Sequence, residues 1–164
     1  MIRKEETNDL VKRVTAAALK ALASEKELTV SFAPGQASAT RDSATLPSPV
    51  GNIDTDNLKK MRGIADSLAL RLRYHDSDIH KSHMPSGTDA RAIHEAMEQV
   101  RCESLGVKQF TGVADNLNVL LDQRYKAKGF NSLTDQKEEN LIDAVSVMVR
   151  EKLTGIATPK SAEK

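Results

Sequence analysis

Three histidines lie close together in the middle of the chain, at His75, His80 and His83, with aspartates among them. On a helix His80 and His83 would face the same way within one turn, the spacing at which two imidazoles can share a metal ion. Asp76 or Asp78 could add an oxygen ligand. The alternative is a short polar connection between two helices, in which His and Asp commonly cap or neutralise helix ends. No Cys is nearby and the sequence offers no second ligand pair, so we favour the connection over a native metal site.

Charged residues just before the histidines raise a second question. Arg62 and Asp66 stand four residues apart, so they can form an ordinary surface ion pair worth a few tenths of a kcal/mol. Alternatively, Asp66 and Arg71 belong to a polar cluster that locks this helix to its neighbours or to another subunit, because buried charges need such partners. We place structural locking above a binding surface, and both above catalysis. The predicted cluster consists of Arg62, Asp66, Arg71, His75, Asp76 and His80.

Other reactive residue types give no catalytic signature. Cys102 stands midway along a predicted helix with no His at helical spacing, which favours a packing role over a nucleophile. His94 lies beside an apolar stripe and is expected to pack between helices. The segment 155–161 superficially resembles a phosphate-binding loop, but it is one residue short and follows a helix rather than a strand. We therefore predict no catalytic residue and no cofactor bound to this chain.

Composition excludes several classes of partner. The sequence has 164 residues, with 24 Lys and Arg against 23 Asp and Glu, and the resulting net charge of +1 does not favour polyphosphate or an anionic membrane. Aromatic residues make up 3% of the chain, which leaves few platforms on which bases could stack. One Cys excludes an internal disulfide, and no apolar stretch reaches membrane-spanning length. We expect a cytoplasmic protein that binds neither nucleic acid nor membrane.

The pattern of apolar residues predicts a helix, two strands and a second helix in the first half of the chain. The first helix runs from about Thr7 to Ser24, and the second begins at Thr55 or Asp56 and ends near His75. Between them a strand over 28–33 and a partner near 44–47 would close a small hairpin, and residues 35–55 would be exposed. The buried stripe predicted for the first helix is Leu10, Val14, Ala17 and Ala21, flanked by Val11, Ala18 and Leu22.

Three further helices are predicted in the second half. The first begins at Ser86, which could form a capping box with Asp89, and ends at Gly106. The next is centred on 113–121 and ends at Gly129. The last is capped by Thr134 or Asp135, ends at Gly155, and would bury Leu141, Ala144, Val145, Met148, Val149 and Leu153. The predicted fold is mainly α: a five-helix bundle with a small β-hairpin between the first two helices, one domain over 1–158 and a disordered tail over 159–164.

The order of several blocks resembles a known family. The sequence RGIADSLALRLRYHDSDIH at 62–80 is followed by ARAIHEAMEQVRCESLG at 90–106, GVADNL at 112–117 and LDQRY at 121–125. LTVSFAPG precedes these blocks, and DAVSVMVREKLTG follows them. The set is similar to the N-terminal region of the T subunit of aerobic cobaltochelatase, the CobT family, and the resemblance covers about residues 10–155.

The resemblance implies a role in an ATP-dependent enzyme that inserts cobalt into hydrogenobyrinic acid a,c-diamide during cobalamin (vitamin B12) biosynthesis. In that enzyme a large N subunit holds the corrinoid, an AAA+ S subunit hydrolyses ATP with Mg²⁺, and the T subunit assembles with the AAA+ subunit. The role implied for this chain is a non-catalytic assembly module. Polar residues of the second helix and of 75–83 would contact the AAA+ subunit or a second copy of the chain.

The family pattern carries over to a set of positions in the second helix and just after it: Arg62, Gly63, Ala65, Asp66, Ala69, Leu70, Arg71, His75, Asp76 and His80. Family members continue into a von Willebrand factor A-like domain whose Asp-x-Ser-x-Ser motif binds a divalent ion. We expect that domain to be absent here, since the motif does not occur. The alternative function is transient Co²⁺ binding and delivery, for which imidazole and carboxylate are suitable ligands, through His75, Asp76, His80 and His83.

Overall fold

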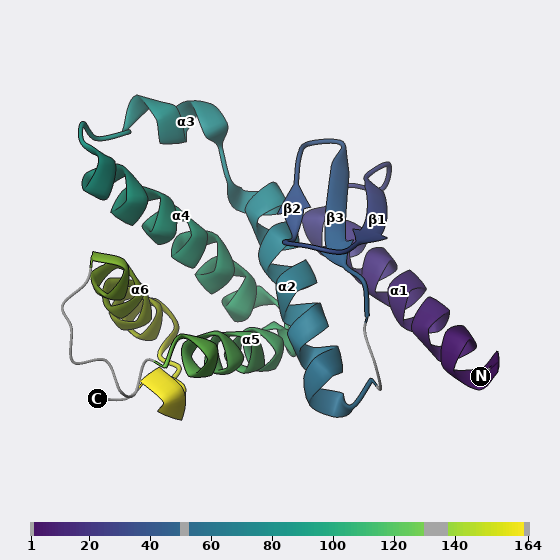
Figure 1. The fold of residues 1–164 in the computed structure, drawn as a ribbon. Coiled ribbons are helices and arrows are strands. Elements are labelled where there is room, and N and C mark those ends of the chain that lie inside the picture. Colours follow the sequence, from purple (N-terminus) through teal and green to yellow (C-terminus); the bar gives the residue numbers. More distant parts are fainter. Residues whose placement is uncertain (1, 50–52, 130–137, 163–164) are drawn as a thin grey trace.

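A computed structural model describes residues 2–49, 53–129 and 138–162. Within these residues six α-helices and a three-stranded sheet are arranged around α2, which lies between the sheet and α1 on one side and α4 and α5 on the other (Figure 1). The mainly helical prediction is confirmed. In chain order the elements are α1 (Ile2–Ala23), β1 (Thr29–Ala33), β2 (Ser38–Ala39), β3 (Ser43–Pro47), α2 (Thr55–Tyr74), α3 (Ser77–Ser82), α4 (Thr88–Gln109), α5 (Val113–Lys128), α6 (Glu138–Thr154) and a 3-10 turn (Lys160–Ala162).

The central helix α2 begins at an acidic cap and buries an apolar face. The Asp54 side chain accepts the backbone N–H of Asn57 at 2.7 Å, which satisfies one of the free amides at the helix start. Ala65, Ala69 and Leu70 then lie in the core together with residues of α1, the sheet and α5. The core cluster has these further buried members: Leu19, Leu22, Ala23, Leu28, Ala44, Leu46, Val113, Leu117 and Leu120.

Two glycines set how closely the helices approach α2. A Cβ atom at Gly63 would stand 2.5 Å from the carbonyl oxygen of Asn116 in α5, and one at Gly106 would stand 2.2 Å from Leu70 Cδ2. Neither contact is sterically allowed, so glycine permits both crossings. The prediction that Gly106 ends its helix is wrong. This glycine lies inside α4, which continues to Gln109 because Gly106 packs beneath a side chain of α2.

The sheet differs from the predicted hairpin. Both predicted strands form, but β1 and β3 pair in parallel, with Val30 opposite Ala44, and the sheet order is β1-β3-β2. The hairpin is instead made by β2 and β3, which pair in antiparallel fashion with Ser38 opposite Thr45. Parallel strands need a crossover, and residues 34–42 provide it while adding β2 at the other edge of β3. The prediction missed β2 because a strand of two residues is too short to show an alternation of apolar and polar side chains.

The predicted connection between the second and third helices contains a helix of its own. Asp76 accepts the backbone N–H groups of Asp78 and Ile79, each at 3.0 Å, and so starts α3. The described residues therefore contain six α-helices where five were predicted. The capping box at the next helix does not form, because the residue at the start of α4 is Gly87, with φ of 97°, and no side chain caps it.

The predicted apolar stripe faces outward in α1 and is divided in α6. In α1 the predicted residues Leu10, Val14, Ala17 and Ala21 are all exposed, while Thr15 and Leu19 face the core. These helices carry apolar residues on more than one face, so periodicity alone does not choose the buried one. In α6 the stripe is divided, since Leu141, Met148 and Leu153 are exposed, Ala144, Val145 and Val149 are half-buried, and Arg150 is buried.

The remaining boundaries follow the prediction in part. Gly129 and Gly155 take positive φ at the ends of α5 and α6, as expected for helix-ending glycines. The predicted caps Thr134 and Asp135 lie outside the described residues. The predicted disordered tail is structured in part, since Ser161 in the 3-10 turn is 3% exposed. No helix among the described residues is long and apolar enough to cross a membrane.

Candidate functional site

Three elements converge where α2 ends. His75 caps the C-terminus of α2, and its backbone N–H donates to Arg71 O at 3.0 Å. Asp76 then starts α3, which leads into α4 (Figure 1), and His80 of α3 contacts Glu95 of α4. On α4 the acidic residues Glu95 and Glu98 stand one turn apart and face this junction. We call this region the histidine junction and define it by His75, His80, His94, Glu95 and Glu98.

Glu98 is the hub of one half of the junction. Its side chain is 13% exposed, and its Oε1 atom lies 2.9 Å from Nδ1 of His75. Arg101 donates from Nε to Oε2 at 2.7 Å and from one terminal nitrogen to Oε1 at 2.8 Å. The hydrogen bonds from Arg101, followed by that from His75, outweigh burial and lower the pKa of Glu98 to about 2. Glu98 is therefore an ionised carboxylate at neutral pH.

His80 occupies the other half of the junction. Its side chain is 8% exposed, and its Nε2 atom lies 2.8 Å from Oε2 of Glu95, which also pairs with Arg71. The His80 ring stands 4.9 Å from the His75 ring and 4.4 Å from the His94 ring, measured between centroids. The Nδ1 atom of His94 is buried and has no hydrogen-bond partner among the described residues. Three imidazoles and two carboxylates thus meet at one place.

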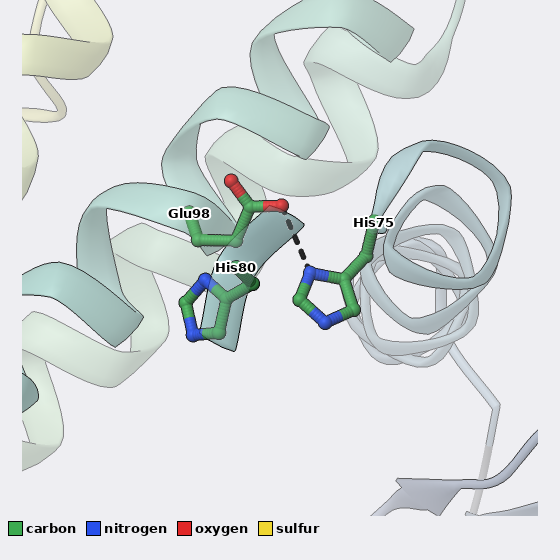
Figure 2. Close-up of side chains that lie close together, drawn as sticks. All are labelled: His75, His80 and Glu98. Atoms are coloured by element: carbon green, nitrogen blue, oxygen red, sulfur yellow. Dashed lines mark hydrogen bonds and ion pairs between the residues drawn. The ribbon is translucent and has the colours of Figure 1, made fainter. Parts of the chain in front are cut away.

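In Figure 2 a ring nitrogen of His75 is directed at a carboxylate oxygen of Glu98, and the His80 ring lies beside the same glutamate. One donor atom from each of these side chains lies within 4.8 Å of the others, so the group could hold a metal ion. A cavity of about 480 Å³ adjoins the group and is lined by His80, His94 and Glu98, together with Tyr74, Asp76, Ile79, His83 and Arg101. The site therefore combines imidazole and carboxylate donors with open space beside them.

The structure brings together only part of the metal set considered from the sequence. His75 and His80 lie together, but the carboxylate of Asp76 accepts hydrogen bonds from two backbone amides at the start of α3. His83 lies at the end of α3, where its Nδ1 atom is 2.9 Å from the backbone oxygen of Ile79. Glu98 takes the place of both, and sequence reasoning missed it because nothing in one sequence aligns α4 with the end of α2.

The predicted polar cluster is divided between two places. Arg71, His75 and His80 belong to the histidine junction or pair with it, whereas Asp66 faces α5. Asp66 is 0% exposed, so its pair with Arg62, at 3.5 Å, is not an ordinary surface pair. Asn116 donates to Oδ2 of Asp66 at 2.7 Å, and burial raises the pKa of Asp66 against the effects of Asn116 and Arg62. These contacts connect α2 to α5.

The comparison with known families covers nearly the whole chain. The sequence model described as "Cobalamin biosynthesis protein CobT" matches residues 5–164. The chain belongs to the CobT family. This match confirms the resemblance carried by the blocks between Arg62 and Tyr125, and it gives the chain a role in cobalamin biosynthesis. No solved structure matches the chain.

In this CobT-family chain the lone cysteine lies at the rim of the histidine junction. Cys102 is buried, and burial, followed by the charge of Glu98, raises the pKa of its thiol to about 12. The thiol therefore stays protonated at neutral pH, which is unfavourable for a nucleophile. Its full burial within α4 agrees with the packing role predicted from the sequence.

Proposed function

We propose that this chain is a non-catalytic assembly module of the ATP-dependent aerobic cobaltochelatase, the enzyme that inserts cobalt into hydrogenobyrinic acid a,c-diamide. Its partners are the AAA+ S subunit and the large N subunit, and a second copy of the chain is a further candidate. ATP with Mg²⁺ and the substrate Co²⁺ are used by the complex. Membership of the CobT family supports the pathway, and two features of the structure support the assembly role.

The first feature is that Asp66 and Arg71 of α2, together with its C-cap His75, are engaged by side chains of the same chain. Arg71 pairs with Glu95, His75 with Glu98, and Asp66 with Arg62 and Asn116. These contacts hold α2 and its C-cap to α4 and α5, so they act within the chain. The polar residues first expected to contact a partner thus largely contact other residues of the same chain. We therefore look for the contact surface in another part of the molecule.

The second feature carries the proposal: α1 exposes an apolar stripe. Leu10 and Val14 are 55% and 53% exposed, and Ala17 and Ala21 continue their row along the helix. The N-terminal half of α1 projects beyond the sheet and α2 (Figure 1). We call this row the α1 stripe. Contact of this apolar row with water is unfavourable in the isolated chain, and burying the row against a partner would lower the free energy.

A groove extends the α1 stripe. Ala21 also lines a cavity of about 590 Å³ between α1, α2 and α5. Its other apolar lining residues are Ala18, Leu22, Leu58, Phe110 and Val113, while Arg62, Asp66 and Asn116 supply polar groups. A helix of a partner protein could thus lie along the stripe and place a side chain in the groove, as amphipathic helices do in apolar grooves.

Co-elution with the purified AAA+ subunit tests this proposal. We expect the wild-type chain to co-elute on size exclusion and the double variant Leu10→Ser/Val14→Ser to do so at least 10-fold more weakly. The matched control is Arg13→Ser, an exposed residue of the same helix that lies outside the stripe. Equal complex formation by the double variant and the wild type contradicts the α1 stripe as the contact. No complex with either cobaltochelatase partner contradicts the assembly role.

A further inference from the structure

We propose that His75, His80 and Glu98 form a binding site for a divalent first-row transition-metal ion of the Zn²⁺ class. The site would connect the end of α2, the short helix α3 and the middle of α4. It differs from the set considered from the sequence, since Asp76 and His83 are not ligands and Glu98 is. The inference rests on donor geometry within the chain and is independent of the proposed assembly role.

The orientation of His80 is the strongest observation. Its Nε2 atom is held by Glu95 Oε2 at 2.8 Å, and the nitrogen turned toward Glu98 in Figure 2 is therefore Nδ1. A carboxylate on the far nitrogen is the usual support of a metal-binding histidine, because it fixes the tautomer and leaves the near nitrogen as a lone-pair donor. Glu95 is in turn paired with Arg71, so the support is itself held in place.

The distances are close to those of a coordination site. In a tetrahedral site with bonds of about 2.0 to 2.2 Å, neighbouring donor atoms stand roughly 3.3 Å apart. His75 Nδ1 and Glu98 Oε1 are already 2.9 Å apart, and no pair in the group is separated by more than 4.8 Å. Closing the widest pair requires a shift of at most roughly 1.5 Å, which side-chain rotation can supply.

The charges around Glu98 suit a metal ligand. Metal binding requires an ionised carboxylate, and the two charge-assisted hydrogen bonds from Arg101 stabilise that form of Glu98. Oε1 of Glu98 accepts from Arg101 at 2.8 Å and lies 2.9 Å from His75 Nδ1, so an ion bound at Oε1 would take the place of the His75 contact while the hydrogen bond from Arg101 remains. An ion bound at Nδ1 of neutral His75 takes the place of the hydrogen bond to Glu98, and the ring proton moves from Nδ1 to Nε2, so the imidazole stays neutral.

The cavity supplies the remaining coordination position. Two imidazoles and one carboxylate leave one place open in a tetrahedral site, and the adjoining space of about 480 Å³ admits water. His94 lines the same cavity with a buried Nδ1 that has no partner in the described part of the chain. Nitrogen donors favour Zn²⁺ and its first-row neighbours, whereas Mg²⁺ demands an octahedral oxygen set that this junction does not offer.

Calorimetric titration of Zn²⁺ into the full chain, produced without a histidine tag, tests the site. We expect one equivalent to bind the wild type, and His75→Ala or His80→Ala to weaken the affinity at least 10-fold. Glu95→Gln keeps the shape but not the charge of the supporting carboxylate, and we expect a loss of about 10-fold. His83→Ala separates this site from the set considered from the sequence, because His83 lines the adjoining cavity but its Nδ1 atom contacts Ile79 O and is not in the donor group. We expect its affinity to be unchanged.

Circular dichroism establishes that each variant is folded, and His80→Gln replaces His80→Ala if the smaller side chain causes loss of helix. Mg²⁺ is titrated in parallel, and no binding is expected. Three results would overturn the site: no Zn²⁺ binding by the wild type, unchanged affinity in folded His75 and His80 variants, or an equal loss in His83→Ala. Because no partner protein enters the experiment, its failure leaves the assembly proposal standing.

Discussion

The histidine junction and the α1 stripe differ in the polarity of their side chains and in what those side chains contact. At the junction, the side chains of His75, His80 and Glu98 are between 8% and 16% exposed, and they contact one another or the exposed Glu95 across α2, α3 and α4. On the N-terminal half of α1, aliphatic side chains face solvent. In these two regions burial does not follow polarity, although the core itself is aliphatic. The polar residues that drew attention in the sequence hold the chain together, and the apolar residues that resembled core are the ones left for a partner.

The largest effect expected from breaking an internal polar contact is at Asp66. Asp66→Ala leaves Arg62 and the amide of Asn116 without their buried partner, and we expect it to lower the free energy of unfolding by about 3 kcal/mol. Urea denaturation followed by circular dichroism measures the change. The control is Asp42→Ala, at an exposed position, with an expected change within about 0.5 kcal/mol. Equal effects of the two substitutions would show that Asp66 does not connect α2 to α5.

At the histidine junction, Glu98→Gln keeps the shape of the side chain and removes its charge. We expect the free energy of unfolding to fall by about 2 kcal/mol, because the charge-assisted bonds from Arg101 and His75 are replaced by weaker ones. The same denaturation experiment measures it, with the exposed Glu25→Gln as control. A difference below about 0.5 kcal/mol between the two variants would mean that the contacts of Glu98 contribute no more than an exposed ion pair, which would contradict the expected effect of their burial.

The pH dependence of the Glu98 contribution has a definite sign. Its pKa is lowered to about 2 in the folded chain, from an ordinary value of 4.5, so its stabilising effect is complete above pH 4.5 and disappears as pH falls toward 2. We expect the stability difference between wild type and Glu98→Gln to shrink between pH 5 and pH 2.5. Asp66 has a raised pKa, so ionisation of its buried carboxylate lowers stability as pH rises. A constant Glu98 difference across this range would contradict the assignment.

The fold was predictable where local signals were strong. The glycines at the ends of α5 and α6 and the apolar period of α2 predicted these elements well. The parallel pairing of β1 with β3 was not predictable, because one sequence does not state which strand crosses over. The buried face of α1 was predicted incorrectly for a related reason. Its apolar residues surround more than one face, and only the position of α2 and the sheet selects Leu19 over Leu10.

The candidate site shows a similar limit. The sequence singled out His75 and His80, and the structure places them together. It could not supply Glu98, since a glutamate within a helix is common and its distance from His75 along the chain is long. The acidic residues Glu95 and Glu98 and the basic Arg101 do share one face of α4, which marks that face as a partner for charged groups. Which helix meets this face is a tertiary property.

The smallest effect on stability is expected at the α1 stripe. Leu10→Ser/Val14→Ser changes two side chains that are more than half exposed, so we expect the free energy of unfolding of the isolated chain to change by no more than about 0.5 kcal/mol. The same double variant is expected to lose co-elution with the AAA+ subunit. Leu19→Ala, which replaces a fully buried residue of the same helix, is the contrasting variant and should cost about 3 kcal/mol. If the double variant destabilises the isolated chain as much as Leu19→Ala does, the stripe is part of the core and the distinction between the two regions fails.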